Sequence, residues 1–221
     1  MVQTLSPANR LKNTQRQCRD QFPEALGLRV HRAISWLLQA EKQQDKDGRF
    51  LFLWIAFNSA YANELGDTHI SEKRIFRHFI SRICELDSGQ ELYSLVWDKY
   101  TSAIRVLLEN KYVYQPYWDW ANQVDKAAID WQTKFQQAKQ YSHKALGKKD
   151  TAGVLHIVFD RLYTLRNQLV HGGATHNSQV NRDQLRDACD ILSDVMPIIV
   201  QLMMEHPNAL WGDAIYPVMD K

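Results

Sequence analysis

A run of eight consecutive apolar residues, Phe50–Phe57, constrains the fold of this chain more than any other feature. A helix turns through about 100° per residue, so a helix made of this run is apolar on every side and has to be buried. We expect such a helix over about residues 49–63, at the centre of the fold. The run is far shorter than the roughly 20 apolar residues that cross a bilayer, so we expect no membrane segment.

Apolar residues recur at helical spacing in six further segments, which indicates helices along most of the chain. Glycine and proline are scarce, with 9 and 6 among 221 residues, whereas an all-β chain needs many turns. The sequence therefore predicts an all-α fold, a bundle of about seven helices. Besides the central helix, the predicted helices cover about residues 25–44, a segment that starts at the N-cap Ser71, and residues 89–110, 117–146, 151–171 and 182–206.

The distribution of charge divides the chain into three expected parts. Residues 1–19 carry four basic and no acidic side chains, and we expect residues 1–24 to be a loose basic arm. The remainder of the chain carries 23 basic and 25 acidic residues, a net charge of −2, so it is no general binder of polyanions and any contact with nucleic acid is local. We expect a helical domain over residues 25–206 and a tail, 207–221, that packs back on it.

The cysteines and the N-terminus bear on compartment and cofactors. Cys18, Cys84 and Cys189 are far apart and form no C-x-x-C pair, so the sequence has no zinc signature. An odd number of scattered cysteines suits a reducing compartment, and the N-terminus lacks the apolar segment of a signal peptide. We expect a cytoplasmic protein without a cofactor or a metal site.

Polar residues gather at the end of the helix predicted over residues 151–171. Arg166, Asn167 and His171 interrupt its apolar pattern, and Gly172 and Gly173 then stop the helix. Arg166 and His171 are five residues apart, about 140° around a regular helix. The two side chains converge only if the arginine reaches a histidine at the frayed helix end, or if a second chain completes the site.

An arginine and a histidine suit the cleavage of RNA without a metal ion. The imidazole can take the proton of the 2′-hydroxyl or protonate the leaving 5′-oxygen, and the guanidinium can hold the scissile phosphate. The residues alone leave a structural alternative open, in which Arg166 makes a salt bridge and His171 caps carbonyl groups at the helix end.

The same residues carry a resemblance to a known superfamily. The stretch Leu165–Gly173 with its Arg166-Asn167-x-x-x-His171 pattern resembles the R-x4–6-H signature of the HEPN superfamily, in its Apea-like branch. The stretch Leu53–Tyr61, which reads LWIAFNSAY, is similar to the early-helix signature of that branch. The two stretches occur in the expected order, and the likeness covers roughly residues 26–206.

The resemblance implies a helical bundle that forms a homodimer, in which two motifs meet as one composite site. It implies that Arg166 and His171 are catalytic and that Asn167 accompanies them. Many HEPN proteins are metal-independent endoribonucleases in toxin–antitoxin, abortive-infection or CRISPR-linked defence, so RNA is the expected substrate and an antitoxin or a nucleotidyltransferase an expected partner. Other members are inactive modules that bind RNA, nucleotide or protein, or scaffolds with a decayed site, and these are the alternatives.

Further candidates for RNA contact lie outside this motif. Asn58 and Tyr61 follow the central apolar run and could line the same cleft, or could be buried polar residues that tie helices together. Arg74 and Arg77 belong to a basic helix face that could follow an RNA backbone or be an ordinary solvated face. Three tryptophans could stack bases, although their helical spacing favours a core: Trp118, Trp120 and Trp131.

Overall fold

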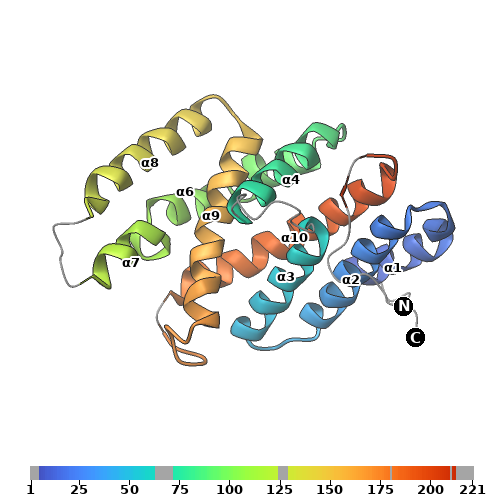
Figure 1. Cartoon of the computed structure of the whole chain (residues 1–221), viewed down its shortest axis with the longest axis horizontal. Helices are drawn as coiled ribbons and strands as arrows, with labels where there is room; N and C mark the ends of the chain where they lie inside the picture. The colour runs from blue at the N-terminus through green and yellow to red at the C-terminus, as the bar shows by residue number, and fades with distance from the viewer. Residues whose placement is uncertain (1–4, 63–71, 124–128, 180, 210, 213–221) are drawn as a thin grey trace. The chain divides into compact units, whose positions relative to one another are not determined.

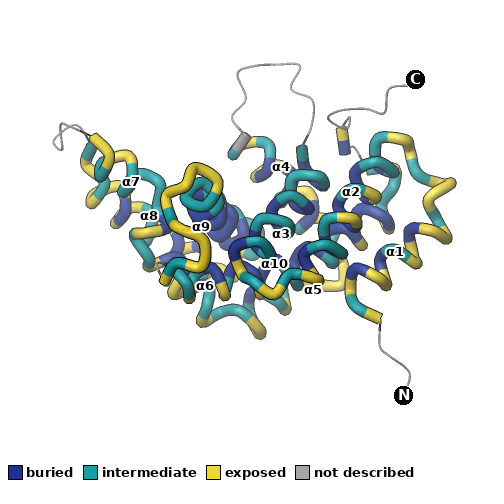
Figure 2. The backbone as a smooth tube through the Cα atoms, turned by 90° about the horizontal axis from the view of Figure 1, so that it is seen from below, coloured by how far each residue is buried: buried dark blue, intermediate teal, exposed yellow. Residues whose placement is uncertain are grey.

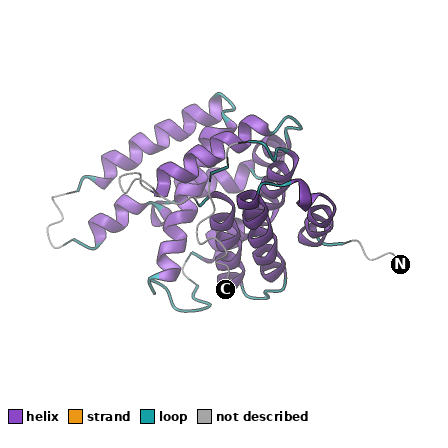
Figure 3. Cartoon of the chain, turned by 45° about the vertical axis from the view of Figure 1, so that its right-hand side comes forward, coloured by secondary structure: helices purple, strands orange, loops and turns teal. Residues whose placement is uncertain are grey.

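The chain is built from helices. The computed structural model describes residues 5–62, 72–123, 129–179, 181–209 and 211–212, and every regular element within them is a helix (Figures 1 and 3). The all-α prediction is confirmed. The described residues form ten α-helices rather than about seven, because two of the predicted helices are interrupted and an additional one lies near the N-terminus.

The chain divides into two compact units. One unit comprises residues 1–89 and 189–221, and the other comprises residues 90–188. Helix α10 (Arg182–Glu205) begins in the second unit and continues in the first. The expected boundaries between arm, domain and tail were drawn from charge and periodicity, and they stay a prediction.

The first unit is centred on the apolar run. Its elements are α1 (Pro7–Cys18), the 3₁₀ turn η1 (Arg19–Gln21), α2 (Glu24–Glu41), α3 (Lys46–Tyr61), α4 (Glu72–Leu86) and most of α10. Helices α2 and α3 lie side by side (Figure 1). Phe50, Trp54 and Phe57 are at most 1% exposed, so the helix expected at the core of the fold is a core helix of this unit.

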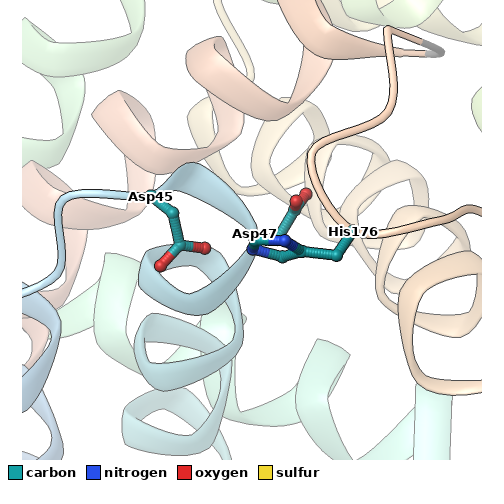
Figure 4. A group of neighbouring side chains, drawn as sticks. All are labelled: Asp45, Asp47 and His176. Atoms are coloured by element: carbon teal, nitrogen blue, oxygen red, sulfur yellow. The ribbon is translucent and has the colours of Figure 1, made fainter.

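The start of α3 is set by a local hydrogen bond. The Asp45 side chain lies at the start of α3 (Figure 4). Its carboxylate accepts from the Gly48 N–H at 2.7 Å and so caps the helix. Phe52, on the other side of α3, stays half-buried, and its ring stacks on Trp36 of α2 at 5.5 Å between centroids. The run is therefore buried over most of its circumference, and Leu51, Phe52 and Ile55 remain half-buried.

The segment expected to be a loose arm contains a helix. Ser6 caps α1, with its Oγ accepting from the Asn9 N–H at 3.4 Å, and Pro7 occupies the first helical position. Glu41 at the end of α2 accepts from the Ser6 hydroxyl at 2.6 Å and from the Ala8 N–H at 3.0 Å. Ser6 and Pro7 thus define the start of α1, and Glu41 attaches α1 to α2, although the segment is basic.

Two predictions from the sequence concern the start of α4 and the C-terminal tail. Ser71, the expected N-cap of α4, lies outside the described residues, as do residues 213–221 of the tail. Of the tail, Trp211 is 7% exposed, and its ring packs edge-on against Phe79 at 6.1 Å. Among the helices that the structure describes, none has both the length and the apolar character to span a membrane.

The second unit is arranged around α9 (Thr151–Val170). Its other elements are α5 (Glu91–Ser94), the π turn η2 (Leu95–Lys99), α6 (Thr101–Glu109), the 3₁₀ turn η3 (Lys111–Val113), α7 (Gln115–Ala121) and α8 (Trp131–Gly147). Helix α9 packs against α6, α8 and η3. The end of α9 is therefore held by elements that precede it by dozens of residues.

Two helices predicted in this unit are interrupted. Within residues 89–110 the Tyr100 N–H donates to the Leu95 carbonyl five residues earlier, at 2.8 Å, and this π turn separates α5 from α6. Within residues 117–146 the helix stops at Ala121, and α8 begins afresh where the Asp130 carboxylate accepts from the Thr133 N–H at 3.0 Å. Periodicity continues across both interruptions, so the apolar pattern alone does not reveal them.

Candidate functional site

The candidate site lies at the C-terminal end of α9, and the first part of that helix holds it in place. Asp150 caps α9 by accepting from the Gly153 N–H at 2.9 Å. The helix then buries an apolar stripe at helical spacing, each residue at most 3% exposed: Val154, Val158, Leu162 and Leu165. The last turn is consequently presented from a rigid, well-packed base.

The glycine pair ends α9 as the sequence predicts. The helix ends at Val170, and Gly172 has a φ of 69°, the left-handed conformation that glycine adopts without steric cost. The Gly172 N–H donates to the Leu169 carbonyl at 3.3 Å, and the Gly173 N–H donates to the Gln168 carbonyl at 2.7 Å. This pair of hydrogen bonds is a Schellman motif, so backbone groups satisfy these carbonyls without help from a side chain.

Arg166 and Asn167 interact directly. The Arg166 guanidinium donates to the Asn167 Oδ1 at 2.9 Å and lies 5.5 Å from the centroid of the Tyr163 ring. Both residues are half-buried. Arg166 makes no salt bridge within the described part of the chain. The guanidinium is therefore oriented by a neutral amide, which leaves its positive charge available to an anion.

His171 occupies the C-cap position and is exposed. The segment that follows α9 is largely exposed (Figure 2). The His171 backbone N–H donates to the Asn167 carbonyl at 3.0 Å, whereas its imidazole makes no hydrogen bond or ion pair with any residue that the structure describes. Because α9 is regular up to Val170, about 140° around the axis separates Arg166 from His171. A single chain thus presents the two side chains diverging from one exposed helix end.

Arg161, on the same helix, is a polar residue that the sequence reasoning missed. It is 3% exposed, donates to the Leu108 carbonyl at 3.3 Å and lies 4.4 Å from the centroid of the Tyr114 ring. Burial lowers the pKa of this guanidinium to about 10. Arg161 comes three residues after Val158 and four before Leu165, so helical spacing places it on the same buried stripe. That spacing was the signal in the sequence that Arg161 is buried.

Gln168 connects the end of α9 to two other segments, and the sequence offered no sign of this. Its side-chain Nε2 donates to the Tyr112 carbonyl at 2.6 Å, and its Oε1 accepts from Asn181 Nδ2 at 2.9 Å. The structure therefore brings η3 and the end of the loop after His171 to the last turn of α9.

The two candidates on α3 belong to the first unit, whereas Arg166, Asn167 and His171 belong to the second. Tyr61 is 3% exposed, and its ring lies among those of Phe57, Phe76 and Phe79 at centroid distances of 4.6, 6.1 and 6.3 Å. It is a core residue that offers RNA no accessible face. Asn58 is half-buried, and its enclosed Oδ1 has no hydrogen-bond partner among the described residues.

The two candidates on α4 are also in the first unit. Arg74 and Arg77 are exposed, and the nearby Arg82 pairs with Glu85 at 3.4 Å. This arrangement is that of a solvated basic helix face, and contact with RNA there stays a prediction.

No family model, curated protein or solved structure matches this chain. The HEPN likeness accordingly rests on the motif residues themselves.

Proposed function

We propose that this chain is a metal-independent endoribonuclease of the HEPN type, acting in the cytoplasm in defence, stress response or a toxin system. The observation that carries the proposal is the exposed end of α9, where an arginine oriented by Asn167 and a histidine without a side-chain partner in the described structure stand five residues apart. These are the two groups that the superfamily motif requires.

Each residue of the motif has a distinct task in this proposal. His171 takes the proton of the 2′-hydroxyl or protonates the leaving 5′-oxygen. Arg166 binds the scissile phosphate through two N–H groups and stabilises the charge that develops on it. Asn167 holds the guanidinium of Arg166 through the 2.9 Å hydrogen bond and so limits its rotamers.

A homodimer completes the site in this proposal. The 140° between Arg166 and His171 keeps them apart on one helix, and a two-fold axis at the end of α9 would bring a second motif beside the first. One histidine then serves as base and the other as acid. Val170, between the two motif residues, is 53% exposed and supplies an apolar contact to such an interface, where like charges otherwise face each other.

The charge of the second unit is consistent with an anionic substrate. Residues 90–188 carry 13 lysines and arginines against 10 aspartates and glutamates, a net charge of +3. The rest of the chain carries 14 against 15, a net charge of −1. The excess of positive charge thus belongs to the unit that carries the motif, and it favours the approach of RNA.

The test is cleavage of RNA in EDTA by the wild type and three variants. We expect His171→Ala and Arg166→Ala each to lower the rate by a factor of about 10² to 10⁴. His176→Ala is the matched control, because His176 is an exposed histidine five residues further along the same unit, and this variant should keep full activity. Products should end in a 2′,3′-cyclic phosphate, and DNA, which lacks the 2′-hydroxyl, should survive.

Two outcomes contradict the proposal in different ways. Loss of activity in EDTA, or equal cleavage of DNA, overturns the mechanism. Binding of RNA by the wild type without any cleavage favours the alternative of a non-catalytic HEPN module, and His171→Ala would then bind RNA about as well as the wild type.

A further inference from the structure

Aromatic side chains cluster around η3 and α7 in the second unit. Tyr117 is at the centre of the cluster, with its ring centroid 5.5 Å from Tyr112, 5.3 Å from Trp118 and 5.0 Å from Trp131. None of the seven residues of α7, all of which the structure describes, is buried. These rings therefore form a half-exposed surface cluster rather than the core that their helical spacing predicts.

Tyr112 is the most exposed ring of this cluster and is held firmly by its backbone. Its carbonyl accepts from Gln168 Nε2 at 2.6 Å and from Trp118 Nε1 at 2.8 Å, and its N–H donates to Asn110 Oδ1 at 2.8 Å. The ring nonetheless stays 45% exposed. An aromatic ring on an anchored backbone loses little conformational entropy when it binds a flat partner.

The anchor also joins the Tyr112 backbone to Gln168 in the last turn of α9. Gln168 precedes His171 by three residues, which in a helix corresponds to a rise of about 4.5 Å and roughly 60° around the axis. Asn181, at the end of the loop that follows His171, donates to the same Gln168 side chain. Tyr112 is therefore attached to the side of α9 on which His171 lies.

A positive charge accompanies the ring. The Lys111 Nζ lies 5.1 Å from the centroid of Tyr112 and 5.3 Å from that of Tyr117. A cation next to an exposed aromatic face matches a nucleotide of a single strand, which presents a flat base and a negative phosphate. A duplex offers no accessible base face, so the chemistry favours single-stranded RNA.

We propose that Tyr112 stacks a nucleobase of single-stranded RNA next to His171 of the candidate site, with Lys111 contacting the backbone. This proposal rests on the proposed ribonuclease function. It adds that the substrate is unpaired at the cleavage site, because only an unpaired base can leave its neighbours and lie on the tyrosine ring.

The experiment measures binding of a fluorescently labelled single-stranded RNA by anisotropy, with every protein carrying His171→Ala so that the RNA stays intact. We expect Tyr112→Ala to weaken binding on the order of 5- to 100-fold, the usual effect of losing one stacked base. Tyr112→Phe keeps the ring and should bind like the parent protein. Tyr141→Ala is the matched control, since Tyr141 is a 55% exposed tyrosine on α8 of the same unit.

A series of RNAs with a single abasic nucleotide at successive positions tests the same contact from the side of the ligand. One abasic position should weaken binding to the parent protein, and at that position Tyr112→Ala should cause no further loss. The abasic series measured on the parent protein alone stands even if Tyr112→Ala fails to fold.

The outcomes separate this proposal from the function on which it rests. If the wild type binds and cleaves RNA but Tyr112→Ala binds like the parent, or no abasic position matters, stacking at Tyr112 is overturned while the ribonuclease proposal stands. Equal weakening by Tyr112→Phe and Tyr112→Ala also overturns stacking. If no RNA binds to the parent protein, both proposals fall, and a protein partner becomes the occupant to seek.

Discussion

The first part of α9 and its last turn have opposite surroundings. Residues 151–165 are mostly buried and include the capped start of the helix, whereas residues 166–173 are half-buried or exposed. Each of these two parts carries an arginine. Arg161 lies in the interior on aromatic rings and a carbonyl oxygen, and Arg166 lies at the surface with a neutral amide.

The difference teaches that the residue type alone does not assign a role on this helix. A buried arginine is costly to desolvate and is kept in place by packing, so the role of Arg161 is to stabilise the second unit. A surface arginine with a neutral partner costs little and can bind an anion, so Arg166 is available for function. The boundary between the two environments falls directly after Leu165, which is 3% exposed.

The largest expected effect concerns these two arginines and the free energy of unfolding. Arg161→Ala should lower it by about 2–4 kcal/mol, because the change leaves a cavity beside Tyr114 and Phe135 and removes a donor from the Leu108 carbonyl. Arg166→Ala should change it by less than about 0.5 kcal/mol while abolishing most activity. Urea unfolding followed by circular dichroism measures both values.

Equal destabilisation by the two variants would mean that Arg166 is a structural residue like Arg161, which would return the motif to the alternative of a stabilised helix end. If Arg161→Ala has the same free energy of unfolding as the wild type, the packing around the buried guanidinium makes no net contribution to stability.

The second-largest expected effect concerns the homodimer that we propose at the exposed end of α9. Val170→Asp places a carboxylate where the two helix ends would meet, so the dissociation constant of the dimer should rise at least about tenfold. Val106→Asp is the matched control, because Val106 is a valine of similar exposure, 55% against 53%, on α6 of the same unit. Light scattering across a concentration series measures both. A wild type that is monomeric and fully active would contradict the composite site.

The smallest expected effect compares two glycines. Gly172→Ala should destabilise the protein by about 1 kcal/mol, because alanine disfavours the left-handed conformation at a φ of 69°. Gly27→Ala, in α2, should stabilise it by about 0.5–1 kcal/mol, since an added Cβ meets no atom within 4 Å there. Thermal unfolding should show shifts of opposite sign. A Gly172→Ala variant at least as stable as the wild type would mean that the Schellman motif does not set the end of α9.

Sequence reasoning worked where structure depends on residues close in the chain. It predicted the extent of α9 and its end at Gly172 and Gly173, because caps and the Schellman motif join residues at most five positions apart. It failed at the break between α7 and α8, where the apolar spacing continues although the helix does not. Asp130, a good N-cap, was the signal that could have located the new start.

Periodicity and short-range motifs were enough to predict the all-α class, the buried apolar run of α3 and the polar residues at the end of α9. The surroundings of those polar residues depend instead on contacts between distant segments. The hydrogen bond from Gln168 to the Tyr112 carbonyl joins residues 56 positions apart, and the one from Arg161 to Leu108 joins residues 53 apart. Neither contact leaves a periodic or local trace in the sequence, because each depends on how α9 packs on α6 and on the η3 turn that follows it.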